Sequence, residues 1–318
     1  MISLAITGSS GFVGSHLIRS LRDRTESKYH IACLAREDRK EADAFIAFDL
    51  SSEFQLESFL TSTDVIIHCA ARVHQMSEGA LASDNQYVQA NVVATARLAQ
   101  QAAAAGAKRF IFLSSVKALG ESTAPNEAYR FDSAYNPQDP YGESKAEAEK
   151  ELVKIARETG MEVTIIRAPL VYGPGVKANF ASLLKLAEKN LPLPLGSVNN
   201  ARSMVGIQNL VDLIVTCIDH PNAGNQIFMA SDGHDVSTSE LLKEMTRAFG
   251  KKPRLLPFPM SLMSFAARLV GKGAIADRLF GSLRVDIEHT KKTLDWVPKV
   301  SLQEELARCV EYMKGQEK

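Results

Sequence analysis

The stretch LAITGSSGFVGSHL, residues 4–17, joins an apolar run to three glycines, Gly8, Gly11 and Gly14, and then becomes amphipathic. Glycine is used where a backbone turns sharply or approaches a ligand closely, because it carries no side chain. The order of buried strand, glycine turn and helix also directs the unpaired N–H groups of the helix start toward whatever lies in front. A glycine turn can serve packing alone, but this order favours the pyrophosphate site of a dinucleotide-binding fold.

Composition excludes several classes of protein. The chain has 318 residues, is 45% hydrophobic and carries a formal net charge of +0, which suits one large or two smaller globular domains. A neutral chain without a basic tract argues against a nucleic-acid partner. No apolar run approaches the roughly 20 residues of a spanning helix, so we expect no stable membrane insertion.

The N-terminus and the cysteines bear on the cellular compartment. The chain runs from Met1 directly into the first apolar strand, which predicts no signal peptide and a cytoplasmic location. Its four cysteines are scattered without the spacing of a disulfide framework or a metal site. We therefore expect reduced, buried thiols and no metal.

Short apolar runs without strict polar alternation predict a sheet that is covered on both faces. They occupy residues 2–7, 29–35, 44–50, 64–71, 109–115 and 162–173. Helical periodicity fills the intervals, most clearly over residues 84–105 and 141–159. The predicted fold class is α/β, a Rossmann-type doubly wound parallel sheet with a smaller C-terminal substrate-binding lobe.

After residue 172 prolines mark the sequence more often and the irregular connections become longer, so the proposed domain division is placed there. Residues 1–172 are predicted to form the NAD(P)-binding domain and residues 173–318 mainly the substrate lobe. Within the lobe, about residues 202–232 are expected to return to the main sheet, because residues 225–232 have the pattern of a strand.

Strand ends indicate which cofactor binds, since ligands of doubly wound sheets bind at the carboxyl ends of the strands. The second apolar run ends at Arg36, where an arginine suits the 2′-phosphate of NADP better than a ribose diol. Arg39 or Lys40 could assist it, and a solvated surface arginine is the alternative. NADP(H) is therefore favoured and NAD(H) remains possible. Asp49, after the third run, is placed to meet the adenine amino group.

Candidate chemistry lies at Ser115, Tyr141 and Lys145. Tyr141 and Lys145 are four residues apart at a predicted helix start, so their side chains share a face. An ammonium beside a phenol favours the phenolate, which predicts a lowered tyrosine pKa and a proton carrier. Ser115 follows a strand and can orient a substrate oxygen. The same spacing also fits an ordinary charged helix face, and the order of the motifs favours the catalytic interpretation.

These motifs together resemble the extended short-chain dehydrogenase/reductase family, within it the nucleotide-sugar 4-epimerases and 4-keto-reductases. The resemblance runs over essentially the whole chain. It rests on TGSSGFVG, DL, HCAA, NVVAT, Ser115, YGESK and RAPLVYGPG, followed by VKANF, RSMVGIQNLVDLI and LDWVPKVSLQEEL.

The resemblance implies a role for each matching residue. Tyr141 would be the general acid/base, Lys145 would bind the nicotinamide ribose, and Ser115, or Ser114 in its place, would hold the reacting oxygen. Asn91 matches a structural asparagine of the long helix. The implied cofactor-binding residues are Gly8, Ser10, Gly11, Phe12, Val13, Gly14, Arg36, Asp49, Leu50, Ala70, Ala71, Tyr141 and Lys145. The implied substrate-binding residues are Arg72, Ser115, Lys117, Asn179 and Arg202, the last as a clamp on the UDP diphosphate.

The family's chemistry implies hydride transfer at C4 of a UDP-hexose. Because many epimerases of this kind have an acidic residue in place of Arg36, and an Arg-Asp pair where this chain has Arg202-Ser203, the first choice is a UDP-4-keto-6-deoxy-N-acetylhexosamine 4-reductase in surface-glycan precursor synthesis. A UDP-glucose or UDP-N-acetylglucosamine 4-epimerase is the alternative. A non-catalytic nucleotide-sensing scaffold is a third, disfavoured by the intact Ser115, Tyr141 and Lys145. The two long helices suit a homodimer.

Three further features are assigned to packing. His68 is expected in the core, and Trp296 is expected to anchor the C-terminal segment. The apolar stretch at residues 260–280 is expected to cover the sugar pocket, with contact at a membrane surface as the lesser alternative.

Overall fold

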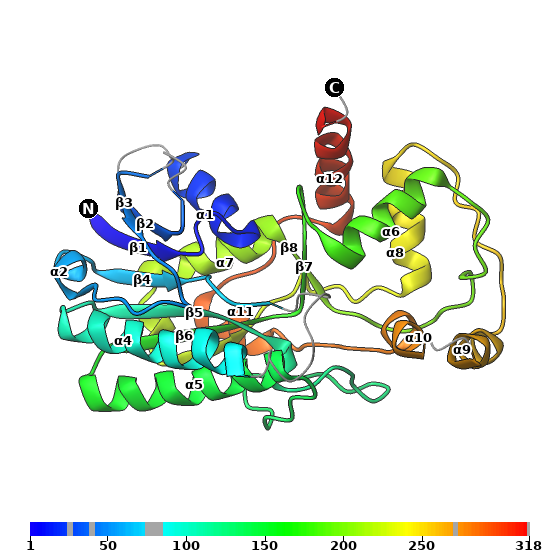
Figure 1. Cartoon of the computed structure of the whole chain (residues 1–318). Coiled ribbons are helices and arrows are strands. Elements are labelled where there is room, and N and C mark those ends of the chain that lie inside the picture. The colour runs from blue at the N-terminus through cyan, green and yellow to red at the C-terminus, as the bar shows by residue number, and fades with distance from the viewer. Residues whose placement is uncertain (24–27, 38–41, 74–84, 270–272, 317–318) are drawn as a thin grey trace.

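The computed structural model describes residues 1–23, 28–37, 42–73, 85–269 and 273–316. In this part of the chain, seven parallel strands form the main sheet in the order β3-β2-β1-β4-β5-β6-β9 (Figure 1). The strands are β1 (Ile2–Thr7), β2 (Tyr29–Ala35), β3 (Ala44–Ala47), β4 (Val65–His68), β5 (Arg109–Ser115), β6 (Glu162–Ala168) and β9 (Gln226–Met229). The order reverses between β1 and β4, which places a ligand-binding crevice at their carboxyl ends.

Helices cover both faces of this sheet, as the unalternating apolar strands predict. One face packs against α1 (Phe12–Asp23), α7 (Ile207–Asp219) and α11 (Glu288–Leu294). The other packs against α2 (Glu57–Leu60), α4 (Ala94–Ala104) and α5 (Pro140–Thr159). Figure 1 shows α4 and α5 side by side below the sheet. The predicted doubly wound Rossmann-type fold is confirmed.

Two predicted elements differ in detail. The apolar run 162–173 divides into β6 and β7 (Leu170–Tyr172) at Pro169, which has no N–H to donate to a ladder. β7 pairs instead with β8 (Met204–Gly206) in a separate two-stranded sheet. The long helix predicted from residue 84 is described from residue 85, and its residues Val88–Val93 form a π-helix, η1, before α4.

The C-terminal part has its own apolar cluster, which joins α6 (Ala178–Lys189), α8 (Thr238–Ala248) and α12 (Leu302–Gln316). α9 (Met260–Leu269) and α10 (Gly273–Phe280) lie together at the edge of this lobe in Figure 1. The short helices are η2 (Val116–Ala118) and η3 (Pro221–Ala223). β9 pairs in parallel with β6, so the chain crosses back to the main sheet after residue 173. The domain division at residue 172 stays a prediction.

Of the three features assigned to packing, His68 and Trp296 are buried, whereas the apolar stretch 260–280 exposes Leu262, Phe265 and Leu269. His68 is fully buried between the hydroxyls of Thr7 and Thr95, at 2.7 and 2.9 Å, and burial lowers its pKa to about 3. Trp296 is buried and its indole N–H donates to Asp212 at 3.0 Å. The cysteines are free thiols. Within the described ranges, the helices are all too short or too polar to cross a membrane.

A buried carboxyl group lies where α12 meets the β7–β8 sheet. Glu305 is fully buried, and within the described residues its Oε1 has no hydrogen-bond partner. Burial raises the pKa of Glu305 to about 7, opposed by Arg308, whose Nη1 lies 3.4 Å from Oε2, and reinforced by the nearby Asp232. The protein therefore holds this group as a neutral acid up to about neutral pH.

We predict that Glu305→Gln stabilises the protein at pH 8. Because the folded state raises the pKa of Glu305 from 4.5 to about 7, it binds more protons than the unfolded state between these values, and stability falls as pH rises through this window. The loss in the wild type amounts to at most about 3–4 kcal/mol at 1.36 kcal/mol per pKa unit. Urea unfolding should show the variant more stable at pH 8 and the two proteins alike near pH 4.5. The exposed Glu311→Gln on the same helix is the control, and a wild type whose stability does not fall between pH 5 and 8 contradicts the prediction.

Candidate active site

The glycine turn is built by two close backbone approaches. Gly8 has a φ of +67°, and a Cβ there would lie 2.7 Å from the backbone nitrogen of Ala70, after β4. A Cβ on Gly14 would overlap the carbonyl oxygen of Gly8. A Cβ on Gly11 would approach only that oxygen, at 3.1 Å, and would otherwise point into open space. Gly8 and Gly14 are thus required by packing, whereas Gly11 keeps space free in front of α1.

That space is a cleft of about 390 Å³ at the carboxyl ends of β1, β2 and β4. It brings together many residues predicted to bind the cofactor: Gly8, Ser10, Gly11, Arg36, Asp49, Leu50, Ala70 and Ala71, together with the predicted substrate residue Arg72. Leu34, Ala35, Phe48, Ser51, Cys69, Val73 and Ala90 also line it and were not singled out from the sequence. A groove from the N-terminus of α1 to Arg36 and Asp49 fits the pyrophosphate and adenosine of a dinucleotide.

Phe12, Val13 and Gly14 are not among the residues that line the cleft. They form the start of α1, where Phe12 packs edge-on against His16 with ring centroids 5.4 Å apart. What they can offer a cofactor is the unpaired backbone N–H groups of the first helical turn.

The end of the cleft that is lined by Arg36 and Asp49 is charged. Asp49 accepts hydrogen bonds from the backbone and the hydroxyl of Ser51, at 2.9 and 2.7 Å. These bonds, and to a smaller extent the charge of Arg36, lower the pKa of Asp49. Arg36 is exposed and its guanidinium can reach a phosphate group from solvent. Arg39 and Lys40, its predicted helpers, lie outside the described residues.

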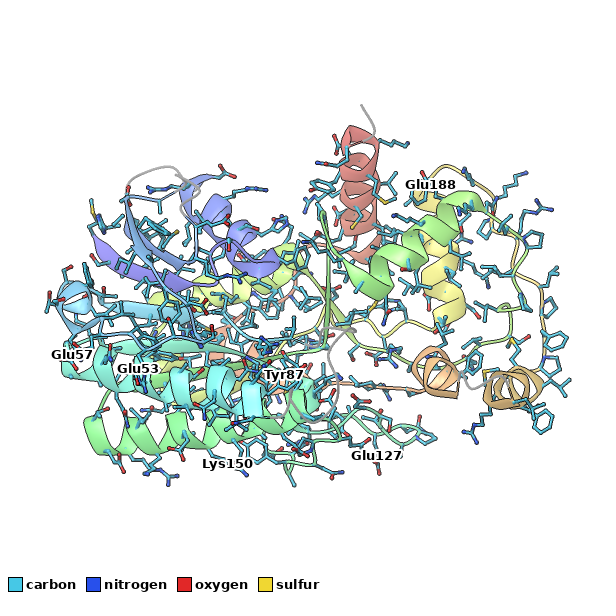
Figure 2. The ribbon with its side chains drawn as sticks, viewed as in Figure 1. Glu53, Glu57, Tyr87, Glu127, Lys150 and Glu188 are labelled. Carbon is cyan, nitrogen blue, oxygen red and sulfur yellow. The ribbon has the colours of Figure 1, made fainter. Side chains whose placement is uncertain are left out.

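Ser115, Tyr141 and Lys145 meet where β5 ends and α5 begins. The Ser115 hydroxyl lies near enough to the Tyr141 phenol to lower its pKa in part. The Lys145 ammonium is buried, donates to the carbonyl oxygen of Leu113 at 2.8 Å, and lies 6.0 Å from the centroid of the Tyr141 ring. Tyr87, labelled in Figure 2, packs edge-on against Tyr141 with ring centroids 6.4 Å apart.

The expected lowering of the Tyr141 pKa is wrong for this structure. Burial raises the pKa of Tyr141, with the charge of Asp139 adding to the effect and the hydrogen bond from Ser115 opposing it. Burial lowers the pKa of Lys145 to about 8, opposed by Glu149. Desolvation therefore outweighs the attraction between ammonium and phenolate, and Tyr141 is held as a neutral phenol beside Ser115.

A buried polar network lies directly behind these residues. Glu149, one turn after Lys145 on α5, accepts two bonds from Nε of Arg167 and one from its Nη2, at 2.7–3.2 Å. The same carboxylate accepts from the hydroxyls of Ser114 and Tyr135. Ser114 is committed to this network, so the structure leaves Ser115 as the serine that faces Tyr141. No sequence spacing signals the pairing of Glu149 with Arg167.

Asn91 connects the cleft to α5, the helix that carries Tyr141 and Lys145. Its side-chain amide bonds both the N–H and the carbonyl of Arg72, at 2.8 and 3.0 Å, and donates to the Ser144 hydroxyl at 2.9 Å. Ser144 donates in turn to the carbonyl oxygen of Tyr141. Asn91 is buried in η1, which agrees with the structural role that the resemblance implies.

The predicted substrate residues are dispersed. Lys117 is paired with Glu121 and with Asp139, the N-cap of α5. Arg202 donates to the carbonyl oxygen of Gly281 at 3.1 Å, and its pKa is lowered by burial and raised in part by the charge of Glu121. Glu121 therefore lies within electrostatic range of both cations. Asn179 is exposed in the first turn of α6.

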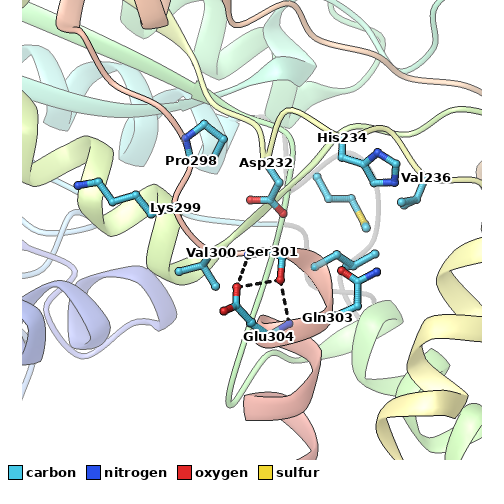
Figure 3. A pocket seen from close by; sticks show the side chains of 11 residues that line it. Asp232, His234, Val236, Pro298, Lys299, Val300, Ser301, Gln303 and Glu304 are labelled. Carbon is cyan, nitrogen blue, oxygen red and sulfur yellow. Dashed lines mark hydrogen bonds between the residues drawn. The ribbon is translucent and has the colours of Figure 1, made fainter.

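A second cavity of about 390 Å³ contains none of the predicted site residues. It lies where residues 298–304 meet Asp232 and His234 (Figure 3). Ser301 and Glu304, which line it, form the reciprocal hydrogen bonds of a capping box at the start of α12. These polar groups are used in building the helix terminus, so the glycine cleft is the candidate site.

The fold and the cleft define a Rossmann-type enzyme with a nicotinamide cofactor. A family model described as the NAD dependent epimerase/dehydratase family matches residues 4–230, and the chain belongs to this family. It is accordingly an NAD(P)-dependent enzyme of the short-chain dehydrogenase/reductase type.

Three known proteins illustrate the similarity. The UDP-glucose 4-epimerase of Vibrio cholerae is 47% identical over 303 residues, covering 95% of this chain and 92% of the relative. The UDP-glucuronic acid 4-epimerase of Bacillus cereus, solved with NAD, superposes with a TM-score of 0.78 at 21% identity, covering 98% and 97% of the two chains. The UDP-glucose 4-epimerase of Thermotoga maritima, solved with UDP-glucose, gives a TM-score of 0.77 at 21% identity and full coverage of both chains.

We predict that Gly11→Val abolishes cofactor binding at modest loss of stability. The new side chain fills the space in front of α1, whereas the backbone there needs no positive φ. Gly14→Ala is the matched comparison, because its Cβ would overlap Gly8 and should lower the free energy of unfolding by about 1–3 kcal/mol. Titration with NAD(H) and NADP(H), with thermal unfolding in parallel, measures both effects. Unchanged cofactor affinity in Gly11→Val would return the glycine turn to a packing role.

Proposed function

We propose that the protein is a UDP-hexose 4-epimerase. The observation that carries the proposal is the 47% identity over nearly the full length to a UDP-glucose 4-epimerase, in a chain that brings Ser115 and Lys145 close to Tyr141. The same groups argue against the non-catalytic scaffold, which would need the glycine cleft but no proton carrier.

The mechanism follows from what these side chains can do. A C4 hydroxyl placed between Ser115 and Tyr141 would give its proton to Tyr141 and later take it back. Because burial holds Tyr141 as a neutral phenol, its pKa would first have to fall and the phenol lose its own proton when cofactor and substrate fill the site. When bound, the nicotinamide would take the C4 hydride and give it back to the other face of the sugar, inverting C4. One N–H of the Lys145 ammonium donates to the carbonyl oxygen of Leu113, and its two other N–H groups could donate to ribose hydroxyls.

A second function, reduction of a UDP-4-keto-6-deoxy-N-acetylhexosamine with NADPH, is favoured by Arg36. A reductase consumes a reduced cofactor in each turnover, and an exposed arginine at the end of β2 suits the 2′-phosphate of NADPH. This was the first choice from the sequence, and it is less well supported than the epimerase, because the relative at 47% identity is a 4-epimerase. The UDP-sugar substrate, the homodimer and the cytoplasmic location likewise stay proposals.

Tyr141→Phe tests the assignment of the proton carrier. The variant keeps the ring and loses the hydroxyl, so we expect fold and cofactor affinity to persist while turnover falls by on the order of a hundredfold or more. The assay follows interconversion of UDP-glucose with UDP-galactose, and of their N-acetylated forms, by chromatography. Undiminished turnover would remove Tyr141 from the mechanism. The wild type in the same assay separates the two functions. Interconversion without net oxidation of cofactor identifies the epimerase. No interconversion, together with stoichiometric oxidation of NADPH on a UDP-4-keto-6-deoxy sugar, identifies the reductase.

Arg36→Asp tests how the cofactor is selected. If Arg36 binds a 2′-phosphate with charge-assisted hydrogen bonds worth roughly 1.5–3 kcal/mol, the wild type should prefer NADPH to NADH by about tenfold to a hundredfold. The aspartate should reverse the order, since a carboxylate accepts from ribose hydroxyls and repels the phosphate. Equilibrium titration of both cofactors gives the ratio. Equal ratios in wild type and variant would show that Arg36 is a solvated surface residue.

A further inference from the structure

The outer edge of the C-terminal lobe exposes an unusual amount of apolar surface. Leu256, Phe258, Leu262, Phe265 and Leu269 are exposed to between 42% and 72%. They lie on α9 and on the segment that leads into it, and in Figure 1 this segment runs down the side of the lobe that lies farthest from α2. We refer to residues 251–269 as the α9 edge.

The apolar residues of α9 form one outward face. Leu262, Phe265 and Leu269 follow at intervals of three and four residues, which places them on one side of the helix. Met263 and Ser264 between them are less exposed. Of the described α9 residues, none belongs to the three buried apolar clusters of the protein. The fold does not use this face for its own stability.

The same edge is positively charged. Lys251, Lys252, Arg254 and Arg268 are exposed, and residues 245–276 contain no Asp or Glu although the whole chain has a net charge of +0. Acidic residues near the edge include Asp277 on α10, the helix that packs against α9, and Glu188, labelled in Figure 2, whose backbone oxygen accepts from Lys251. Glu188 has Lys185 and Lys189 on the same helix, so the surroundings of the edge remain basic.

We propose that the α9 edge is a peripheral docking surface for a bilayer of anionic phospholipid. Leu262, Phe265 and Leu269 enter the boundary between headgroups and acyl chains, and the lysines and arginines bind headgroup phosphates. A second copy of this chain is a poorer occupant, because a two-fold contact would bring the same cations face to face without an acidic residue in 245–276 to pair with them. A bilayer supplies both the apolar layer and the negative charge.

Docking here would orient the candidate substrate site. The end of α10 and the residue after it are bonded to the predicted substrate residue Arg202 and to its neighbour Asn200. Gly281 accepts from Arg202 at 3.1 Å and from Asn200 at 2.9 Å, and Leu279 accepts from Asn200 at 3.2 Å. The lobe that carries Arg202 is therefore the one turned toward the lipid. The surface itself is independent of whether the enzyme is an epimerase or a reductase.

Cosedimentation with vesicles tests the proposal on the full chain. We expect binding to vesicles of phosphatidylglycerol and phosphatidylcholine, at least tenfold weaker binding to phosphatidylcholine alone, and a similar loss at 0.5 M NaCl. Phe265→Asp should weaken binding at least tenfold, and so should Lys251→Gln combined with Lys252→Gln. Phe59→Asp on α2 is the matched control, since Phe59 is 58% exposed and Phe265 is 63% exposed.

Several outcomes would overturn the proposal. They are absence of binding to the anionic vesicles, equal binding by Phe265→Asp and Phe59→Asp, or insensitivity to salt. A change of oligomeric state in Phe265→Asp by sedimentation velocity, without vesicle binding by the wild type, would assign the face to a second copy of the chain. Leu269→Asp, at a residue 72% exposed, repeats the test at a second position, with thermal unfolding to verify that each variant is folded.

Discussion

The buried ion pair between Glu149 and Arg167 is the interaction on which the candidate active site depends. It joins α5 to β6, and through Ser114 it also holds the end of β5, the strand that presents Ser115. Both side chains are almost fully excluded from solvent, so loss of either partner would leave an unpaired buried charge, which typically destabilises by about 3–5 kcal/mol. Glu149 also opposes the desolvation of Lys145 one turn earlier on the helix. One carboxylate thus fixes the position of α5 and favours the charged form of Lys145.

The parts of this arrangement that the sequence predicts are those encoded locally. Gly8, Gly11 and Gly14 identify the turn within a few residues, because Gly8 and Gly14 are required by close backbone approaches and Gly11 keeps the space in front of α1 free. The uniform apolar runs identify the parallel strands, and Asp139 followed by Pro140 gives α5 a recognisable start. The clustering of Arg36 and Asp49 with the glycines follows from a fold rule, since carboxyl ends of parallel strands share one edge of the sheet.

The parts that the sequence does not predict depend on which groups meet in three dimensions. Tyr141 and Lys145 suggest a lowered tyrosine pKa by their spacing, yet the pKa of Tyr141 is raised. Its burial, reinforced by the charge of Asp139, outweighs a lysine whose ammonium is turned to Leu113. Lys117 matches a substrate position in the family and is instead engaged by Glu121 and Asp139. The pKa of Tyr141 and the pairing of Lys117 both depend on groups that are distant in the sequence, so no local sequence pattern indicates them.

The preference for a reductase illustrates the same limit. It rests on Arg202-Ser203 and, for the cofactor, on Arg36. Arg36 directly follows β2, whereas Ser115 ends β5, and the strand order puts β1 and β4 between them. Three strand spacings of about 4.8 Å separate these positions by about 14 Å, so a contact with the adenosine end of the cofactor is remote from C4 of the sugar. Arg36 can select a nucleotide without affecting whether the hydride is returned to the same molecule. An epimerase must keep both the reduced cofactor and the keto sugar bound until the hydride is returned. Residues throughout the cleft and the C-terminal lobe contribute to that retention. Near full-length similarity to an epimerase therefore weighs more than one residue at a strand end.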